Sequence, residues 1–436
     1  MLKALPSLRI AGLDALHRIY RSGTLARHLL GRLAMSLLLA PTLAVAADFG
    51  ELVDDLATAS PYTFVDDGVL SDIVKWDDIQ QKSLAIADLT VGHLDGVGHG
   101  WVFKTPIKIH FRIYRNRQET RGGIVISSGR TEGVPLYQEL IYDLLKNGYS
   151  VYIHDHRGQG FSSRLRDDNI GYVDDFGNYV TDLTAFVSKV QQQRPSGSKP
   201  LFLLAHSMGG AIAALYLGSG QPTPFAAAAF VTPMMEPWAN GDPSLGRKGD
   251  VAQYVCDKGA SLGFEVPFLS PTIVDGQADF DAMEKAGRAN TGLNGLTQSS
   301  SRYRHNWDAR AGRCEPMQSE HCGSPTAKVS GSSLRWFLQA CKASLSARTQ
   351  EAKEIGVPVL LLQGGKDQIV NPQAQKAFCQ NMNAAGKAKC TGVLLPTSQH
   401  ATLIEQDGIR KPALAAILSH FECAASGGGG CRQIVK

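Results

Sequence analysis

A tight turn in the middle of the chain joins an apolar strand to a helix and carries a serine at its tip. Residues 201–205 form an apolar run typical of a buried strand, and residues 208–217 have the composition of a helix. The turn between them reads Ala205-His206-Ser207-Met208-Gly209. Its tightness demands small residues two positions before and after the serine, and Ala205 and Gly209 meet that demand. The context predicts a nucleophilic hydroxyl on Ser207; the alternative is a loop serine that caps the helix.

A serine hydroxyl needs a base to activate it, and the base needs an acid to orient it. Asp367 follows the apolar run 357–363, and His400 follows the strand-like run 391–395. Parallel strands open on one edge of a sheet, so the three side chains are expected to converge there. We therefore predict Asp367 as the acid and His400 as the base, against the alternatives of a turn aspartate and a structural histidine.

The developing negative charge on a substrate oxygen needs backbone N–H donors. Met208, the first residue of the helix after Ser207, is one candidate. The second is expected in the loop after an early strand, and Ser128-Gly129-Arg130 follows the run 123–127. We predict the N–H groups of Met208 and Arg130 as donors, with the side chain of Arg130 solvated. The loop at His156 and Arg157 is expected to shape the floor of the site.

Strand-like and helix-like segments alternate after residue 100. An antiparallel hairpin is expected from 101–104 and 108–114, followed by alternating elements up to residue 231 and again from 357 to the last helix. This alternation predicts an α/β fold with a mostly parallel sheet and helices on both faces. Residues 237–350 break it and are interpreted as an inserted, largely helical cap; an independent domain is the alternative.

The N-terminal segment has the features of an export signal. Basic residues come first, the apolar run 33–46 follows, and it ends in the small residues Ala44-Val45-Ala46. The run is shorter than the roughly 20 residues that span a bilayer. We predict a cleavable signal peptide at 1–46 and a periplasmic or secreted protein, with an uncleaved anchor as the alternative and the true start codon open. The remaining chain is nearly neutral, which gives no electrostatic reason to bind nucleic acid.

The chain has eight cysteines, all at or beyond position 256. An even number in an exported chain favours disulfides. Local spacing suggests Cys314–Cys322, Cys379–Cys390 and Cys423–Cys431, which leaves Cys256–Cys341. A zinc site using His321 and Cys322 is the competing interpretation, but the chain lacks a CxxC pair.

Several segments, in order, resemble the bacterial lysophospholipase and monoacylglycerol lipase group of α/β-hydrolases (serine aminopeptidase S33-like hydrolases). Two departures are Ala205 in place of the first glycine of the turn and Ser128 where many lipases have histidine. The segments that carry the resemblance are IVISSGRTEG (124–133), DHRGQGFSSR (155–164), LLAHSMGG (203–210), LTQSSSRYRHN (296–306), GSPTAKVSGSSLRWFLQA (323–340), LLLQGGKDQIV (360–370) and SQHATLIE (398–405).

The resemblance implies an α/β-hydrolase fold with Ser207 as nucleophile, Asp367 as acid, His400 as base and Arg130 and Met208 as oxyanion donors. It implies hydrolysis of lysophospholipids or monoacylglycerols, without cofactor or metal, through transient contact with a membrane surface. The alternatives are a short-chain or aryl esterase, a thioesterase, or a catalytically silent binding protein. Expected parts are the core at 47–236 and 351–424, the cap at 237–350 and a flexible tail at 425–436. Oligomeric state stays open.

Overall fold

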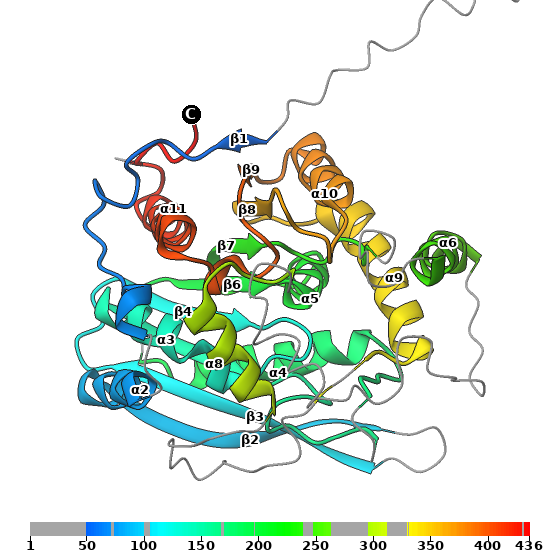
Figure 1. Cartoon of the computed structure of the whole chain (residues 1–436), viewed down its shortest axis with the longest axis horizontal. Coiled ribbons are helices and arrows are strands. Elements are labelled where there is room, and N and C mark those ends of the chain that lie inside the picture. Colours follow the sequence, from blue (N-terminus) through cyan, green and yellow to red (C-terminus); the bar gives the residue numbers. More distant parts are fainter. Residues whose placement is uncertain are drawn as a thin grey trace, which may run out of the picture. The chain divides into compact units, whose positions relative to one another are not determined.

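A nine-stranded sheet lies at the centre of the described part of the chain (Figure 1). The computed structural model describes residues 49–70, 74–99, 105–166, 170–195, 197–238, 247–262, 295–311, 329, 331–429 and 431–436. The strands lie in the order β1-β9-β8-β7-β6-β4-β5-β3-β2. They are β1 (Gly50–Glu51), β2 (Ala87–His99), β3 (Thr105–Asn116), β4 (Gly122–Ser127), β5 (Tyr149–His154), β6 (Leu201–His206), β7 (Phe225–Val231), β8 (Val359–Gly364) and β9 (Cys390–Leu395).

The pairing is parallel from β1 through β5 in this order, and β3 pairs antiparallel with both β5 and β2. Helices pack on both faces, so the predicted α/β fold with a mostly parallel sheet is confirmed. The helices are α2 (Val74–Ile86), α3 (Gln138–Lys146), α4 (Gly177–Gln193), α5 (Met208–Leu217), α6 (Arg247–Leu262), α8 (Ser300–Ala311), α9 (Leu334–Thr349), α10 (Pro372–Ala385) and α11 (Asp407–Ala425).

Alternation along the central strands explains why both faces of the sheet are covered. Leu203 and Ala205 of β6 belong to the buried cluster that also holds side chains of α4, α5, α9 and α10. Phe202 and Leu204, one residue out of phase, belong to the cluster with α3 and α11. Successive side chains of a strand point to opposite faces, so an uninterrupted apolar run needs two apolar layers around it.

The antiparallel hairpin differs from the prediction in its first strand. Residues 101–104 lie outside the described residues, and the strand that pairs with β3 is β2, with Ala87 opposite Asn116 and His99 opposite Thr105. The sequence of β2, ADLTVGHLDGVGH, mixes polar residues and glycines. Such a strand lacks the apolar periodicity that reveals strands from sequence alone.

Three helices, α6, α8 and α9, are described within the stretch predicted as a cap. The boundaries of that cap stay a prediction. The tail at 425–436 was predicted to be flexible, but its last residues are hydrogen-bonded to the rest of the chain. Val435 forms a β-bridge with Leu52, and the backbone N–H of Val53 donates to Ile434 at 3.2 Å. The end of the chain therefore completes hydrogen bonds with the segment around β1, and Figure 1 shows the C-terminus near that strand.

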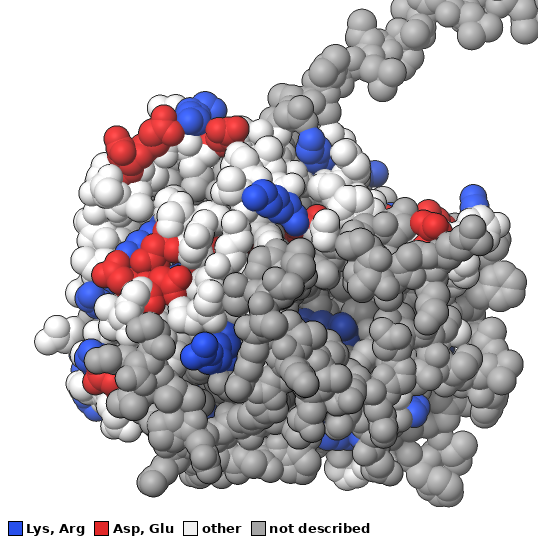
Figure 2. Space-filling view, viewed as in Figure 1, with Lys and Arg blue, Asp and Glu red and all other residues white. Residues whose placement is uncertain are grey.

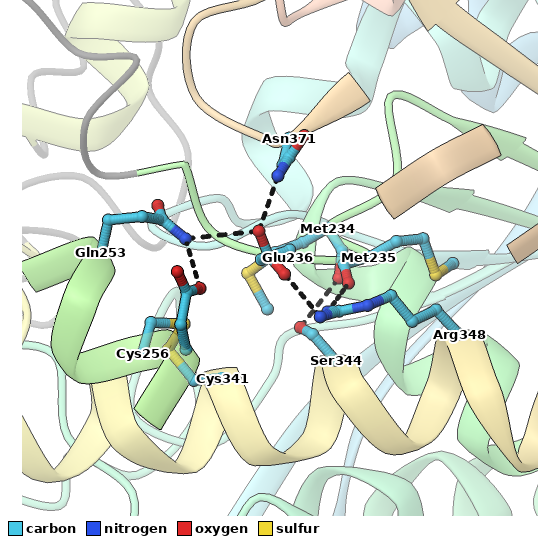
Figure 3. The surroundings of a disulfide bond; sticks show 10 residues. Met234, Met235, Glu236, Gln253, Cys256, Cys341, Ser344, Arg348 and Asn371 are labelled. Atoms are coloured by element: carbon cyan, nitrogen blue, oxygen red, sulfur yellow. Dashed lines mark hydrogen bonds and ion pairs between the residues drawn. A yellow bond between two sulfur atoms is a disulfide. The ribbon is translucent and has the colours of Figure 1, made fainter. Parts of the chain in front are cut away.

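Three of the four expected disulfides are present: Cys256–Cys341, Cys379–Cys390 and Cys423–Cys431. The expected Cys314–Cys322 pair, like His321, lies outside the described residues. Figure 3 shows how Cys256–Cys341 joins α6 to α9.

Beside that disulfide, the buried carboxylate of Glu236 accepts hydrogen bonds from Asn371 at 2.6 Å and Gln253 at 3.3 Å (Figure 3). It also pairs with Arg348 at 2.5 Å. Because Asn371 caps α10 and Gln253 lies on α6, the carboxylate connects both helices to α9, which carries Arg348. Three elements distant in sequence thus share one buried charge.

Charged side chains of both signs are interspersed on the face in Figure 2. Near β1, for example, Lys436 pairs with Asp54 at 2.9 Å and with Glu51 at 3.9 Å. Within the ranges described, no helix is both long and apolar enough to cross a bilayer.

Candidate active site

The turn at Ser207 adopts the strained backbone that the sequence predicts. Ser207 lies between β6 and α5 with φ 50° and ψ −119°, in a region that residues other than glycine rarely occupy. Its N–H donates to Val231 on β7 at 3.1 Å, and its carbonyl accepts from Met234 at 2.8 Å. Neighbouring segments therefore hold the backbone of Ser207 on both sides of the Cα atom.

Gly209 lets this turn pack against the end of β4. A Cβ atom at Gly209 would lie 2.1 Å from the carbonyl oxygen of Ser127 and 2.5 Å from that of Ser128. The hydroxyl of Ser127 donates to the carbonyl of Gly209 at 3.2 Å. The turn is thus in direct contact with the start of the loop predicted to supply an oxyanion donor.

Ser207, His400 and Asp367 come together as predicted. The Oγ atom of Ser207 lies 2.9 Å from Nε2 of His400, and Nδ1 of His400 lies 2.8 Å from Oδ2 of Asp367. All three residues are buried, with Ser207 7% exposed. The three come from the C-terminal ends of β6, β8 and β9, which open on one edge of the sheet.

Asp367 is fixed by its own loop. Its second carboxylate oxygen, Oδ1, accepts from the N–H groups of Ile369 at 2.8 Å and Val370 at 3.3 Å. The loop in turn joins the His400 loop, because the N–H of Lys366 donates to the carbonyl of Ser398 at 2.9 Å. The carboxylate therefore presents its other oxygen to His400 in a defined direction.

The predicted oxyanion donors lie on the two segments that meet at Gly209. Met208 is the first residue of α5, where backbone N–H groups lack partners within the helix. Arg130 lies in the loop after β4, which is tied to Gln159, because the amide of Gln159 donates to the carbonyls of Gly129 at 2.7 Å and Glu132 at 2.9 Å.

The side chain of Arg130 was predicted to be solvated, but it packs against another side chain. Its guanidinium lies 5.2 Å from the ring centroid of Trp336 on α9, a cation–π arrangement, and the residue is half-buried. The loop that follows β4 is therefore linked directly to a helix of the predicted cap stretch.

The loop after β5, which the sequence predicts at the floor of the site, contacts the residue that follows β4 and helix α4. Nε2 of His156 lies 3.1 Å from the carbonyl of Ser128, and burial lowers the pKa of His156 to about 4. Arg157 forms two 2.7 Å hydrogen bonds with Asp182 on α4. His156 thus supports the loop after β4, and Arg157 supports α4.

Two buried carboxylates escaped the sequence prediction. Glu132 accepts from the N–H of Gly129 at 2.5 Å, and Glu405 accepts from the N–H of Gln399 at 2.9 Å. Each thus holds a residue next to a predicted site residue, Arg130 or His400. Both residues lie in motifs that carry the resemblance, at 124–133 and 398–405, and this was the available signal. The sequence does not show which backbone N–H group each carboxylate binds.

The fold and this arrangement define a class of protein. A mostly parallel sheet with helices on both faces carries a serine on a strained strand-to-helix turn, in contact with a histidine and an aspartate from later strand ends. These features define an α/β-hydrolase.

Comparison with known proteins gives the family within this class. The family described as serine aminopeptidase, S33, matches residues 118–263 and 291–407, more than half of the chain. Lysophospholipase L2 of Escherichia coli (strain K12) is 31% identical over 318 residues, 72% of this chain and 84% of that protein. Monoglyceride lipase of Rattus norvegicus is 38% identical over 112 residues, 26% of this chain and 35% of that protein. The chain therefore belongs to this family and is a carboxylic ester hydrolase.

A solved structure shares the fold. A soluble variant of monoglyceride lipase from Saccharomyces cerevisiae, in complex with a substrate analogue, superposes with a TM-score of 0.52 at 17% identity. The match covers 76% of this chain and 95% of that one. At this identity the similarity speaks for the fold alone.

The contact at Gly209 leads to a prediction for the variant Gly209→Ala. The added methyl group meets backbone carbonyls that have no rotamer to change, so the turn and the β4 loop have to separate. We expect the free energy of unfolding in urea to fall by about 1–3 kcal/mol or more, together with loss of ester hydrolysis.

The matched control is Gly408→Ala in the first turn of α11, where an added Cβ meets nothing within 4 Å. This variant should unfold at the wild-type urea concentration or above it. A Gly209→Ala protein with wild-type stability and activity would show that the close contact is unnecessary.

Proposed function

We propose that this chain hydrolyses carboxylic esters of fatty acids, with lysophospholipids or monoacylglycerols as substrates, through a covalent acyl-enzyme on Ser207. The observation that carries the proposal is the continuous hydrogen-bonded chain from Ser207 through His400 to Asp367. The names of the similar proteins, lysophospholipase L2 and monoglyceride lipase, support the substrate class.

In this mechanism, Nε2 of His400 accepts the proton of Ser207 as Oγ attacks the ester carbonyl. The resulting oxyanion accepts hydrogen bonds from the N–H groups of Arg130 and Met208. His400 then donates the proton to the departing alcohol, and a water molecule, deprotonated by His400, releases the fatty acid from Ser207. Asp367 keeps Nδ1 of His400 protonated and stabilises the imidazolium.

The proposal includes export. Three disulfides within the described residues favour an oxidising compartment. The basic-then-apolar segment at 1–46 supplies the corresponding signal. We infer a periplasmic or secreted enzyme that meets its lipid substrates outside the cytoplasm.

The first test is covalent labelling. The intact protein should react with a fluorophosphonate and gain one label on Ser207, located by peptide mass spectrometry. Ser207→Ala should lose the label, and Asp367→Asn should keep its fold but lose about 10⁴-fold in kcat, because the imidazole then takes the wrong tautomer. A folded protein that takes no label would contradict the enzyme mechanism and favour the silent binding protein.

The second test concerns the substrate. A series of lysophospholipids, monoacylglycerols, p-nitrophenyl esters and acyl thioesters of increasing chain length should give the highest kcat/KM for a long-chain lipid ester. A maximum at acetyl or butyryl p-nitrophenyl esters would favour a short-chain aryl esterase. A maximum for the thioesters would favour a thioesterase.

The third test concerns export. The protein recovered from the periplasm or the medium of an expressing bacterium should begin at Ala47 on N-terminal sequencing. Its six cysteines in the three observed pairs should resist alkylation until reduced. Recovery of an uncleaved chain from the cytoplasm, with these cysteines freely alkylated, would contradict the proposal.

A further inference from the structure

A second carboxylate–imidazole pair lies directly beside the catalytic one. Nδ1 of His206 lies 3.0 Å from Oε1 of Glu132, and the two side chains are 4% and 10% exposed. The rings of His206 and His400 are 5.2 Å apart. His206 precedes Ser207 on the strained turn, so this pair is joined to the nucleophile by one peptide bond.

The contacts of His206 identify its charge state. Nδ1 faces the Glu132 carboxylate, and Nε2 lies 3.3 Å from the backbone carbonyl of His400. Both partners are acceptors, and a neutral imidazole has a single N–H to donate. Making both contacts therefore requires the imidazolium form of His206.

The contacts of Glu132 identify it as an anion. Its carboxylate accepts from the N–H of Gly129 at 2.5 Å, from the hydroxyl of Tyr137 at 2.5 Å and from His206. Burial alone raises the pKa of Glu132, but these donors together lower it to about 2. Burial likewise lowers the pKa of His206, but Glu132, the carbonyl of His400 and Asp367 together more than reverse this effect, so the net shift is upward.

We propose that Glu132 and His206 form an ion pair, charged at neutral pH, that positions the catalytic machinery: Glu132 fixes the loop after β4 that carries Arg130, through Gly129, and His206 fixes the His400 loop through its backbone carbonyl. The hydroxyl of Ser207 and the ring nitrogens of His400 bond to each other and to Asp367, so the pair is a positioning element. It acts through the segments that carry Arg130, Ser207 and His400, so the inference rests on the proposed roles of these residues.

Among the described residues, other titratable groups lie close to the pair. The pair borders a cavity of about 20 Å³, room for a single water molecule, which Glu139 also lines. Glu139 is already paired with Arg302 at 2.8 Å and Arg410 at 3.0 Å. Asp367 lies near enough to raise the pKa of His206 further. His156, which contacts the carbonyl of Ser128 in the loop after β4, is neutral because burial lowers its pKa to about 4.

The pair predicts a pH dependence that simple support would not produce. Because the pKa of His206 is raised, its cation is complete at low pH and is lost as the pH rises through that pKa. The rate requires charged His206, which sets an alkaline limb of kcat/KM. A residue that merely fills space would lower the rate equally at every pH.

The first measurement reads the charge directly and needs no turnover. Full-length Ser207→Ala protein, labelled with ¹⁵N-histidine, should show both ring nitrogens of His206 protonated at neutral pH, with the signals assigned by their loss in Ser207→Ala/His206→Gln. A neutral His206 at neutral pH would overturn the proposal whether or not the chain is an ester hydrolase.

The second measurement compares two variants in pH profiles of ester hydrolysis. Glu132→Gln should lower kcat about 10-fold or more at neutral pH, with KM within about twofold, and should move the alkaline limb to lower pH because burial then dominates the pKa of His206. His206→Gln should also lower kcat, but its alkaline limb should disappear. Unchanged kcat and an unchanged alkaline limb in both variants would overturn the proposal.

Two further variants serve as controls. Tyr137→Phe removes one donor to Glu132 and keeps the pair, so a small loss of kcat with the alkaline limb retained is expected. His420→Gln changes another buried histidine, on α11, whose Nε2 lies 3.1 Å from the carbonyl of Ala228, and should leave the profile unchanged. If His420→Gln reproduced the profile of His206→Gln, the effect would not belong to the pair. Circular dichroism and fluorophosphonate labelling confirm that each variant is folded with a reactive serine.

Discussion

The strained backbone of Ser207 is the constraint on which the rest of the site depends. A residue at φ 50° is costly and persists because the surroundings leave no alternative. Here the surroundings are the carbonyls at the end of β4, which approach Gly209 so closely that no side chain fits. The same turn directs the side chains of Ser207 and His206 to different partners, His400 and Glu132. One sharp turn therefore serves two carboxylate–imidazole pairs.

The loop that carries His400 is held by hydrogen bonds, as the backbone of Ser207 is. The carbonyl of His400 accepts from the hydroxyl of Thr232 at 2.7 Å, while the N–H of Ala401 donates to the carbonyl of Leu296 at 2.8 Å. Glu405 accepts from the N–H of Gln399 and, at 3.0 Å, from that of Gln298. Residues 296–298, just before α8, are thus hydrogen-bonded to the loop that carries His400 and to Glu405. These hydrogen bonds join a part of the predicted cap stretch directly to the loop that carries His400.

The core strands and the nucleophile turn could be predicted because their information is local. An apolar run followed by a small-residue turn and a helix identifies itself within about twenty residues of sequence. The second carboxylate–imidazole pair could not be predicted from the sequence, because His206 and Glu132 are 74 positions apart and neither stands out in its local sequence. β2 escaped for a related reason, because its polar and glycine-rich sequence becomes a strand through pairing with β3. Local patterns predict elements, whereas buried polar partners depend on how distant elements meet.

The edge of the sheet at β1 has a consequence for the order of folding. Gly50 pairs with Val393, and Leu52 and Val53 pair with Val435 and Ile434 near the end of the chain. During synthesis, residues 50–53 cannot make these contacts until residues 393–436 have been made. Early compact states therefore lack the contacts that residues 50–53 make in the complete fold. The proposed export would gain from this topology, because the contacts of residues 50–53 are among the last to form.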